Sequence, residues 1–109
     1  MRSLTFLIQM LEKTREHLGT NEMPSQMLLI FAFVAERKEV PMAELCKITG
    51  LAQSSISRNV AKLAQGESPR EPGYGLIEAY EDPYYRKRKL VRVTPKGLKF
   101  AKELEAAIN

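Results

Sequence analysis

One segment of this 109-residue chain gathers side chains that form hydrogen bonds with nucleic acid bases. Gln53 can pair with the edge of adenine, and Arg58 can bind guanine or a phosphate group. Serine hydroxyls can bond with bases or phosphates, and their short side chains let a helix approach a duplex closely. The side chains of this set are Gln53, Ser54, Ser55, Ser57, Arg58 and Lys62. Two of them have an alternative role, because Ser54 and Ser55 could cap the start of a helix.

A run of four basic residues, 86–89, follows further along the chain. At the tip of a β-hairpin such a run would reach phosphates or the adjacent minor groove, where negative potential favours arginine. The candidate contacts are Arg86, Lys87 and Arg88. The alternative is a charged turn that contacts only solvent. Tyr84 and Tyr85 precede the run and could pack against sugars or against the hairpin itself.

The distribution of charge supports a polyanionic partner. The chain has a net charge of +4. Residues 1–51 hold six basic and six acidic residues, whereas residues 52–109 hold eleven basic and seven acidic ones. All of the excess therefore lies in the half that contains both candidate segments. A basic surface favours binding to a polyanion through counterion release, although solvated surface lysines would give the same count.

The elements that must position the first segment form a helix–turn–helix over residues 41–65. Ile56, Val60 and Leu63 recur at helical spacing and predict a helix from about Gln53 to Gln65. A shorter helix, Met42 to Thr49, precedes it after a break at Val40-Pro41, and Gly50 supplies the turn. Leu45 would be the apolar anchor of this first helix, with Cys46 at the crossing point. A helical hairpin in an unrelated bundle would show the same pattern.

The remaining segments predict three further helices and a hairpin. The helix of residues 1–20 is apolar on two faces, so it should pack on two partners, one of which could be a second copy of the chain. A core helix starts at Pro24 or Ser25. Residues 66–75 predict a loop, and residues 76–80 and 90–93 predict two strands around 81–89, giving a wing over 75–94. Thr94 should cap the last helix, 95–109, whose apolar stripe is Leu98, Ala101, Leu104 and Ile108.

These elements predict a single domain, 1–109, that is mainly α with a small β-hairpin. The order of helices and hairpin is that of a winged helix–turn–helix. The helices at both termini, 1–20 and 95–109, are expected to build a dimer.

Other classes of function find no support in the sequence. His17 is the only histidine, and no metal-ligand cluster, nucleophile motif or phosphate-binding loop is present. We therefore expect no enzymatic activity, no metal and no cofactor. The single cysteine, Cys46, indicates a reducing compartment, and the apolar run Leu4 to Ile8 is too short to span a membrane, so we expect a cytoplasmic protein. Cys46 could sense oxidants, but its position at a helix crossing favours packing.

The chain closely resembles the MarR-type winged helix–turn–helix transcriptional regulators over about residues 26–105. The resemblance is most specific in LCKITGLAQSSISRNVAKL and in GLIEAYEDPYYRKRKLVRVTPKG. It implies that Gln53 to Arg58 and Lys62 meet the major groove, that Arg86 is the wing-tip arginine, and that the terminal helices build a homodimer. Three features depart from the family pattern. Ala52 stands where a capping residue is usual, Tyr85 stands where an aspartate precedes the wing arginine, and the loop 66–75 is longer.

The function expected from these observations is sequence-specific binding of double-stranded DNA by a homodimeric transcriptional regulator, a repressor, on a pseudo-palindromic site. The alternative is a winged helix that serves as a protein-interaction module in a replication or partition assembly. The sequence identifies neither the operator nor a small-molecule effector.

Overall fold

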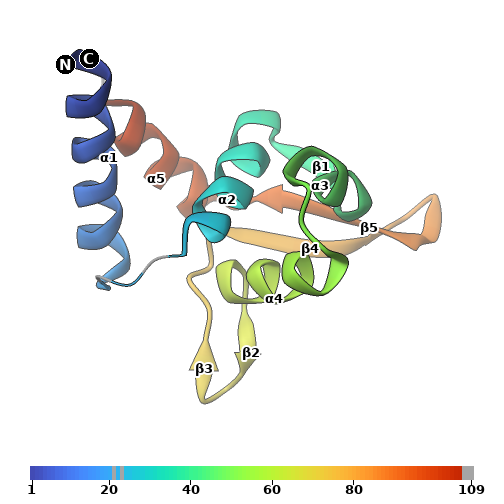
Figure 1. Ribbon diagram of the computed structural model, residues 1–109. Coiled ribbons are helices and arrows are strands. Elements are labelled where there is room, and N and C mark those ends of the chain that lie inside the picture. The colour runs from blue at the N-terminus through green and yellow to red at the C-terminus, as the bar shows by residue number, and fades with distance from the viewer. Residues whose placement is uncertain (21, 23, 107–109) are drawn as a thin grey trace.

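The computed structural model describes residues 1–20, 22 and 24–106, and it has the expected winged-helix order (Figure 1). A three-stranded antiparallel sheet and a cluster of helices form one body, and two terminal helices lie to one side of it. The helices are α1 (Arg2–Leu18), α2 (Ser25–Arg37), α3 (Met42–Thr49), α4 (Gln53–Leu63) and α5 (Pro95–Ala106). The strands are β1 (Glu39–Pro41), β2 (Gly66–Ser68), β3 (Glu71–Pro72), β4 (Ile77–Asp82) and β5 (Tyr85–Val93).

The core forms around α2, as the apolar run of that helix predicts. Ile30 and Val34 are fully buried, and the predicted stripe of α4, Ile56, Val60 and Leu63, packs into the same core cluster. Burying each such side chain contributes about 1.5–3 kcal/mol. This shared core fixes the orientation of α4, so the opposite face of α4 must be the exposed one.

The helix–turn–helix is confirmed, and its turn is held by hydrogen bonds that the residue pattern did not reveal. Gly50 has φ 73°, and its N–H donates to the carbonyl of Cys46 at 3.0 Å. The hydroxyl of Thr49 donates to the carbonyl of Leu45 at 2.5 Å and accepts from the N–H of Leu51 at 3.2 Å. Thr49 therefore bridges the last turn of α3 to the connection, which fixes the angle at which the chain enters α4.

Strand β1 was not predicted, because Val40-Pro41 was expected only to break a helix. The segment instead forms one edge of the sheet, whose strand order is β1-β5-β4. Val40 pairs with Val91, and Pro41 pairs with Leu90. An edge strand tolerates proline because the missing N–H faces away from the ladder.

The wing is present, but its turn was placed wrongly. We expected residues 81–89 to connect the strands, whereas β4 continues to Asp82 and β5 begins at Tyr85. The connection is thus only Pro83-Tyr84, and a carboxylate oxygen of Asp82 accepts from the N–H of Tyr84 at 2.9 Å. Aspartate stabilises turns by such a bond. The basic run therefore lies along strand β5 and not on the turn.

The expected loop at residues 66–75 is also wrong in part, because it contains the short hairpin β2–β3. This hairpin ends α4 at Leu63, earlier than the predicted Gln65. The N–H groups of Gly73 and Tyr74 donate to the carbonyls of Gln65 and Lys62 at 2.9 and 3.0 Å. Carbonyls at the end of a helix need such partners, and here the hairpin base supplies them.

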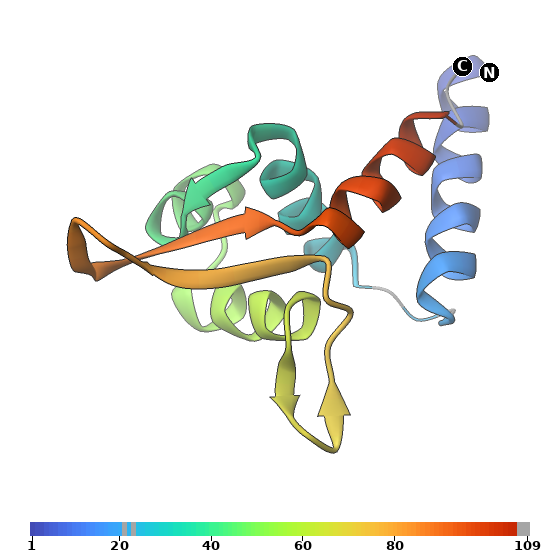
Figure 2. The same ribbon diagram turned by 180° about the vertical axis from the view of Figure 1, so that it is seen from behind.

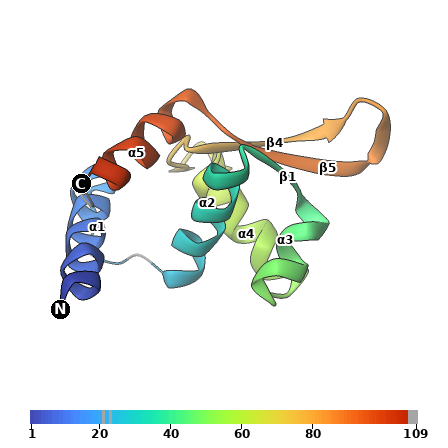
Figure 3. The same ribbon diagram turned by 90° about the horizontal axis from the view of Figure 1, so that it is seen from above.

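The terminal helices lie on one side of the molecule, away from the wing (Figures 2 and 3). The expected cap of α5 is confirmed, since the hydroxyl of Thr94 accepts from the N–H of Gly97 at 3.0 Å. Helix α1 packs on α5, where the ring of His17 stacks on Phe100 with 4.4 Å between centroids. Ile108 of the predicted stripe lies outside the described residues. Within residues 1–20, 22 and 24–106, no helix has the length and apolar character needed to cross a membrane.

Candidate nucleic-acid interface

The exposed face of α4 carries most of the predicted base-reading residues. Gln53, Ser54, Ser57 and Arg58 are exposed and share one face at helical spacing. Ser55 is half-buried, and the carbonyl of Ser55 accepts from the side-chain amide of Asn59 at 2.8 Å. Lys62 is exposed as well, so five of the six predicted residues lie on a surface that turns away from the core.

Helix α4 starts at the predicted residue but without a side-chain cap. Ala52 is the N-cap, and its carbonyl accepts the N–H of Ile56 at 3.0 Å. The alternative in which Ser54 and Ser55 cap the helix is therefore wrong, because both lie within the first turn. The N–H groups of a first turn have no acceptor inside the helix, and the helix dipole adds positive potential there. This end of α4 is consequently suited to an anionic group such as a phosphate.

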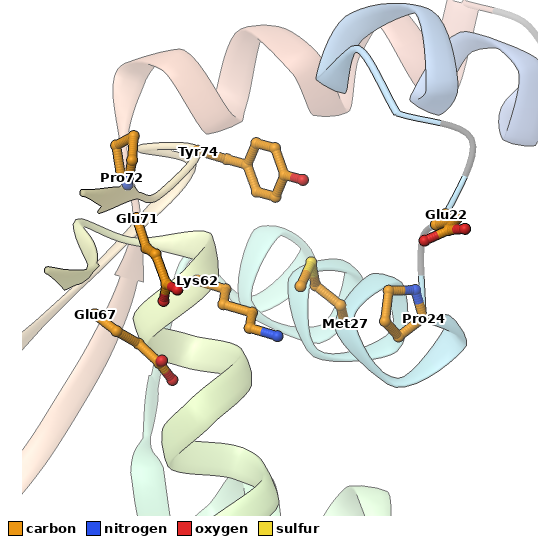
Figure 4. Close-up of a pocket in the computed structure, with 8 residues that line it drawn as sticks. All are labelled: Glu22, Pro24, Met27, Lys62, Glu67, Glu71, Pro72 and Tyr74. Atoms are coloured by element: carbon orange, nitrogen blue, oxygen red, sulfur yellow. The ribbon is translucent and has the colours of Figure 1, made fainter. Parts of the chain in front are cut away.

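Lys62 is exposed at the C-terminal end of α4, one helical turn after Arg58 on the same face. It follows Gln53 by nine positions, or about 13 Å along the helix axis. Its side chain lines a hollow of about 800 Å³ together with Glu67 and Glu71 of the β2–β3 hairpin and Glu22 (Figure 4). The exposed Lys62 side chain thus shares this hollow with hairpin carboxylates, which the residue pattern did not indicate.

The wing presents its basic residues along one exposed strand. Arg86, Lys87 and Arg88 are all exposed on β5, and the side chains of successive strand residues point to opposite faces. Arg88 lies 3.9 Å from the carboxylate of Asp82. An acidic group thus accompanies a wing arginine even though Tyr85 stands where the family has aspartate. Tyr84, at the turn, is 97% exposed and does not pack against the hairpin.

A network of polar side chains joins the root of the wing to β1, and only the alternation of residues along the strands hinted at it. The hydroxyl of Tyr80 donates to the carboxylate of Glu39, and Arg92 donates to the carboxylate of Glu78. The Arg92 guanidinium also lies 4.3 Å from the centroid of the Tyr80 ring. The bond to Glu39 raises the pKa of Tyr80, and the bond to Glu78 raises the pKa of Arg92. These contacts join all three strands.

An apolar groove of about 700 Å³ lies between α1, α2 and α5. Leu7, Met10 and Leu11 of α1 line one side, and Leu28 and Leu29 of α2 line another. Cys46 is half-buried and packs against the core. In the described part of the chain, no three His, Cys, Asp or Glu residues gather where they could hold a metal ion.

The sequence profile of the winged helix DNA-binding domain matches residues 24–97. No curated protein sequence matches the chain. Among solved structures, the transcriptional regulator PcaV from Streptomyces coelicolor, in complex with its natural ligand, is 22% identical with a TM-score of 0.65. The alignment covers 82% of this chain and 57% of PcaV.

Two further structures have the same fold. A mutant of MarR from E. coli, complexed with operator DNA, is 16% identical with a TM-score of 0.66, over 94% of this chain and 71% of MarR. A transcriptional regulator homologue from Pyrococcus horikoshii OT3 is 21% identical with a TM-score of 0.67, over 92% of this chain and 89% of the homologue. The chain thus spans little more than half of PcaV but most of the Pyrococcus protein.

Proposed function

Because this chain belongs to the winged helix DNA-binding family, we propose that it is a MarR-type, sequence-specific repressor acting as a homodimer. The observation that carries the proposal is the exposed polar face of α4 beside a wing with a continuous basic strand. Such a helix fits the major groove, and such a hairpin fits the phosphates or minor groove next to it.

Roles follow from position and chemistry. Gln53, Ser54, Ser57 and Arg58 would contact base edges and nearby phosphates from the first turns of α4. Arg86, Lys87 and Arg88 would bind the backbone or the minor groove from the wing. We expect a smaller contribution from Ser55, which is half-buried, and from Lys62, which shares a hollow with Glu67 and Glu71. For a repressor, the bound site is an operator, as in the MarR structure that contains operator DNA.

An exposed apolar stripe on α1, which includes two residues at the edge of the groove, supports the homodimer. Leu4, Leu7, Ile8 and Leu11 follow helical spacing and are between 42% and 55% exposed. A continuous apolar stripe of this kind usually marks an interface. Pairing two copies through α1 and α5 would set two α4 helices about 34 Å apart, one turn of duplex, on a pseudo-palindrome. The assignment of residues 1–20 and 95–109 to the dimer interface and of 75–94 to the wing belongs to this proposal.

The apolar groove between α1, α2 and α5 offers a place for a small-molecule effector. PcaV was solved with its natural ligand and NadR with 4-hydroxyphenylacetate. A ligand in this groove would contact α1 and α5, so it would act on the spacing of the two recognition helices.

Electrophoretic mobility shift with a duplex selected from a random pool tests the proposal. We expect Arg58→Ala to weaken binding strongly, and Arg37→Ala, which removes one exposed charge on α2, outside the helix–turn–helix, the wing and the terminal helices, to leave it unchanged. The alternative, a protein-interaction module for replication or partition, predicts that no duplex is bound even at low salt.

A further inference from the structure

The β2–β3 hairpin projects from the C-terminal end of α4, on the side to which the exposed face of α4 turns (Figures 1 and 2). Its three-residue strand and turn extend about 10 Å past the helix. A duplex held against the exposed face of α4 would therefore meet the tip of this hairpin. The MarR-type pattern has a shorter connection here, so the hairpin needs an explanation of its own.

The hairpin is fixed rigidly to the recognition helix. Four successive carbonyls at the end of α4, from Lys62 to Gln65, accept N–H groups from residues 73–76 at 2.8–3.0 Å. Such a set of backbone bonds leaves the hairpin base no freedom to rotate against the helix. The tip must therefore keep one position relative to the side chains that face the groove.

Close backbone contacts reinforce this attachment. At Gly66, which has φ 94°, an added Cβ would lie 2.1 Å from the carbonyl oxygen of Glu71. At Gly73 an added Cβ would lie 2.4 Å from the carbonyl oxygen of Ala64. Only glycine fits at both positions, so the segment is built as a compact hairpin against α4.

The hairpin carries two exposed carboxylates and one exposed guanidinium. Glu67 and Glu71 line the hollow that contains Lys62 (Figure 4). The turn, Pro69-Arg70, is exposed and carries a single cation at the tip. Proline limits the conformations of the turn, and arginine binds phosphates in a fixed geometry. The tip is thus the part of the hairpin suited to a polyanion.

The hairpin and the wing lie at opposite ends of α4. The end of α4 that bears the hairpin is nearer to α1 and α5, and the wing points away from these helices (Figures 1 and 3). In a dimer built through α1 and α5, the two hairpins would lie between the recognition helices. The duplex between two half-sites one turn apart turns its minor groove toward the protein.

We propose that the β2–β3 hairpin is a third DNA-contacting element, whose tip lies over the operator centre and whose Arg70 binds the sugar–phosphate backbone there. This proposal rests on the homodimeric DNA-binding function proposed above. Each recognition helix would then have a DNA-contacting hairpin at both ends. The wing would lie at the outer edge of the operator, and the β2–β3 hairpin at its centre.

The first test measures the salt dependence of operator binding for Arg70→Ala, with Arg37→Ala as the matched loss of one exposed arginine outside the proposed DNA and dimer contacts. Log K falls with log salt concentration, and each lost phosphate contact makes this slope shallower by about 0.9. A dimer loses one such contact in each protomer, so its slope should become shallower by about 1.8. Arg37→Ala should keep the wild-type slope. An unchanged slope and affinity in Arg70→Ala would overturn the proposal.

The second test locates the tip on the duplex. Ser68→Cys in a Cys46→Ser background provides a single thiol beside the turn for attachment of an iron–EDTA cleavage reagent. We expect strand cleavage at the operator centre, between the half-sites. Cleavage only outside the half-sites, or none on a duplex that is demonstrably bound, would contradict the placement.

Arg58→Ala separates failure of this proposal from failure of the proposed function. If Arg58→Ala abolishes binding while Arg70→Ala has no effect, α4 reads the operator and the hairpin does not contact it. If neither change affects binding, the interface through α4 is itself wrong, and the hairpin proposal falls with it.

Discussion

Replacing Gly97 by alanine should destabilise the fold, although alanine is the better helix former. Gly97 is buried in the first turn of α5, and an added Cβ would lie 1.9 Å from the carbonyl oxygen of Leu76 and 2.9 Å from a methyl carbon of Val93. The oxygen cannot move away freely, because it accepts the N–H of Thr94 at 3.0 Å. The helix start must therefore shift away from the connection that leads into β4.

The expected cost combines two opposing effects. Overpacking of this kind destabilises by about 1–3 kcal/mol or more, and the gain in helix propensity returns about 1 kcal/mol at most. Because the contact is with backbone, we expect the clash to win, with a net loss of about 1–2 kcal/mol. For a domain of this size, that corresponds to a fall in Tm of roughly 4–16 °C.

Urea unfolding followed by circular dichroism measures this change. Lys96→Ala, at the neighbouring exposed position, is the control and should stay within about 0.5 kcal/mol of the wild type. A Gly97→Ala protein as stable as the wild type, or more stable, would refute the packing described for the junction of wing and α5.

Three other predictions concern the wing root, the dimer and the recognition helix. The pKa of Tyr80 is raised above 10.0, chiefly by its bond to Glu39, so this bond stabilises the fold below pH 10 and is lost as the pH rises through the folded pKa. Glu39→Gln should bring tyrosinate formation, followed by ultraviolet absorbance, to lower pH; an unchanged titration curve would contradict the network. Ile8→Asp should convert a dimer to monomers in sedimentation velocity and weaken operator binding, whereas a persistent dimer would remove α1 from the interface. Lys62→Ala should weaken operator binding less than Gln53→Ala, and the reverse order would mean that Lys62 leaves its acidic hollow to bind DNA.

The helices of this fold were predictable because local patterns determine them. The buried stripe of α4 recurs at helical spacing, and Gly50 marks the turn before it in the residue pattern itself. The same is true of α2 and of the cap that Thr94 provides. Such patterns are reliable because the residues that form them also make the stabilising core contacts and cap hydrogen bonds.

The sequence-based predictions missed elements whose bonding partners are distant in the sequence, and elements held by backbone hydrogen bonds. Strand β1 has only three residues, and its partner strand β5 lies about fifty positions away. Three residues are too few to show the alternation of apolar and polar side chains that predicts a strand. The β2–β3 hairpin depends on N–H groups that bond with the carbonyls of α4, which residue types do not reveal. The bond between Tyr80 and Glu39 joins residues 41 positions apart.

The candidate interface was predictable in composition but not in arrangement. The residue types identified the polar face of α4 and the basic strand of the wing. They did not show that Lys62 shares a hollow with Glu67 and Glu71, or that the wing turn is Pro83-Tyr84. Both depend on how the hairpins fold against the helices.

Selection of bound duplexes from a random pool tests the central claim most directly. The proposed homodimer predicts enrichment of pseudo-palindromes whose half-site centres lie about 10 base pairs apart. Failure to enrich any duplex at low salt, or enrichment of single half-sites without a symmetric partner, would contradict a dimeric regulator that reads DNA through α4.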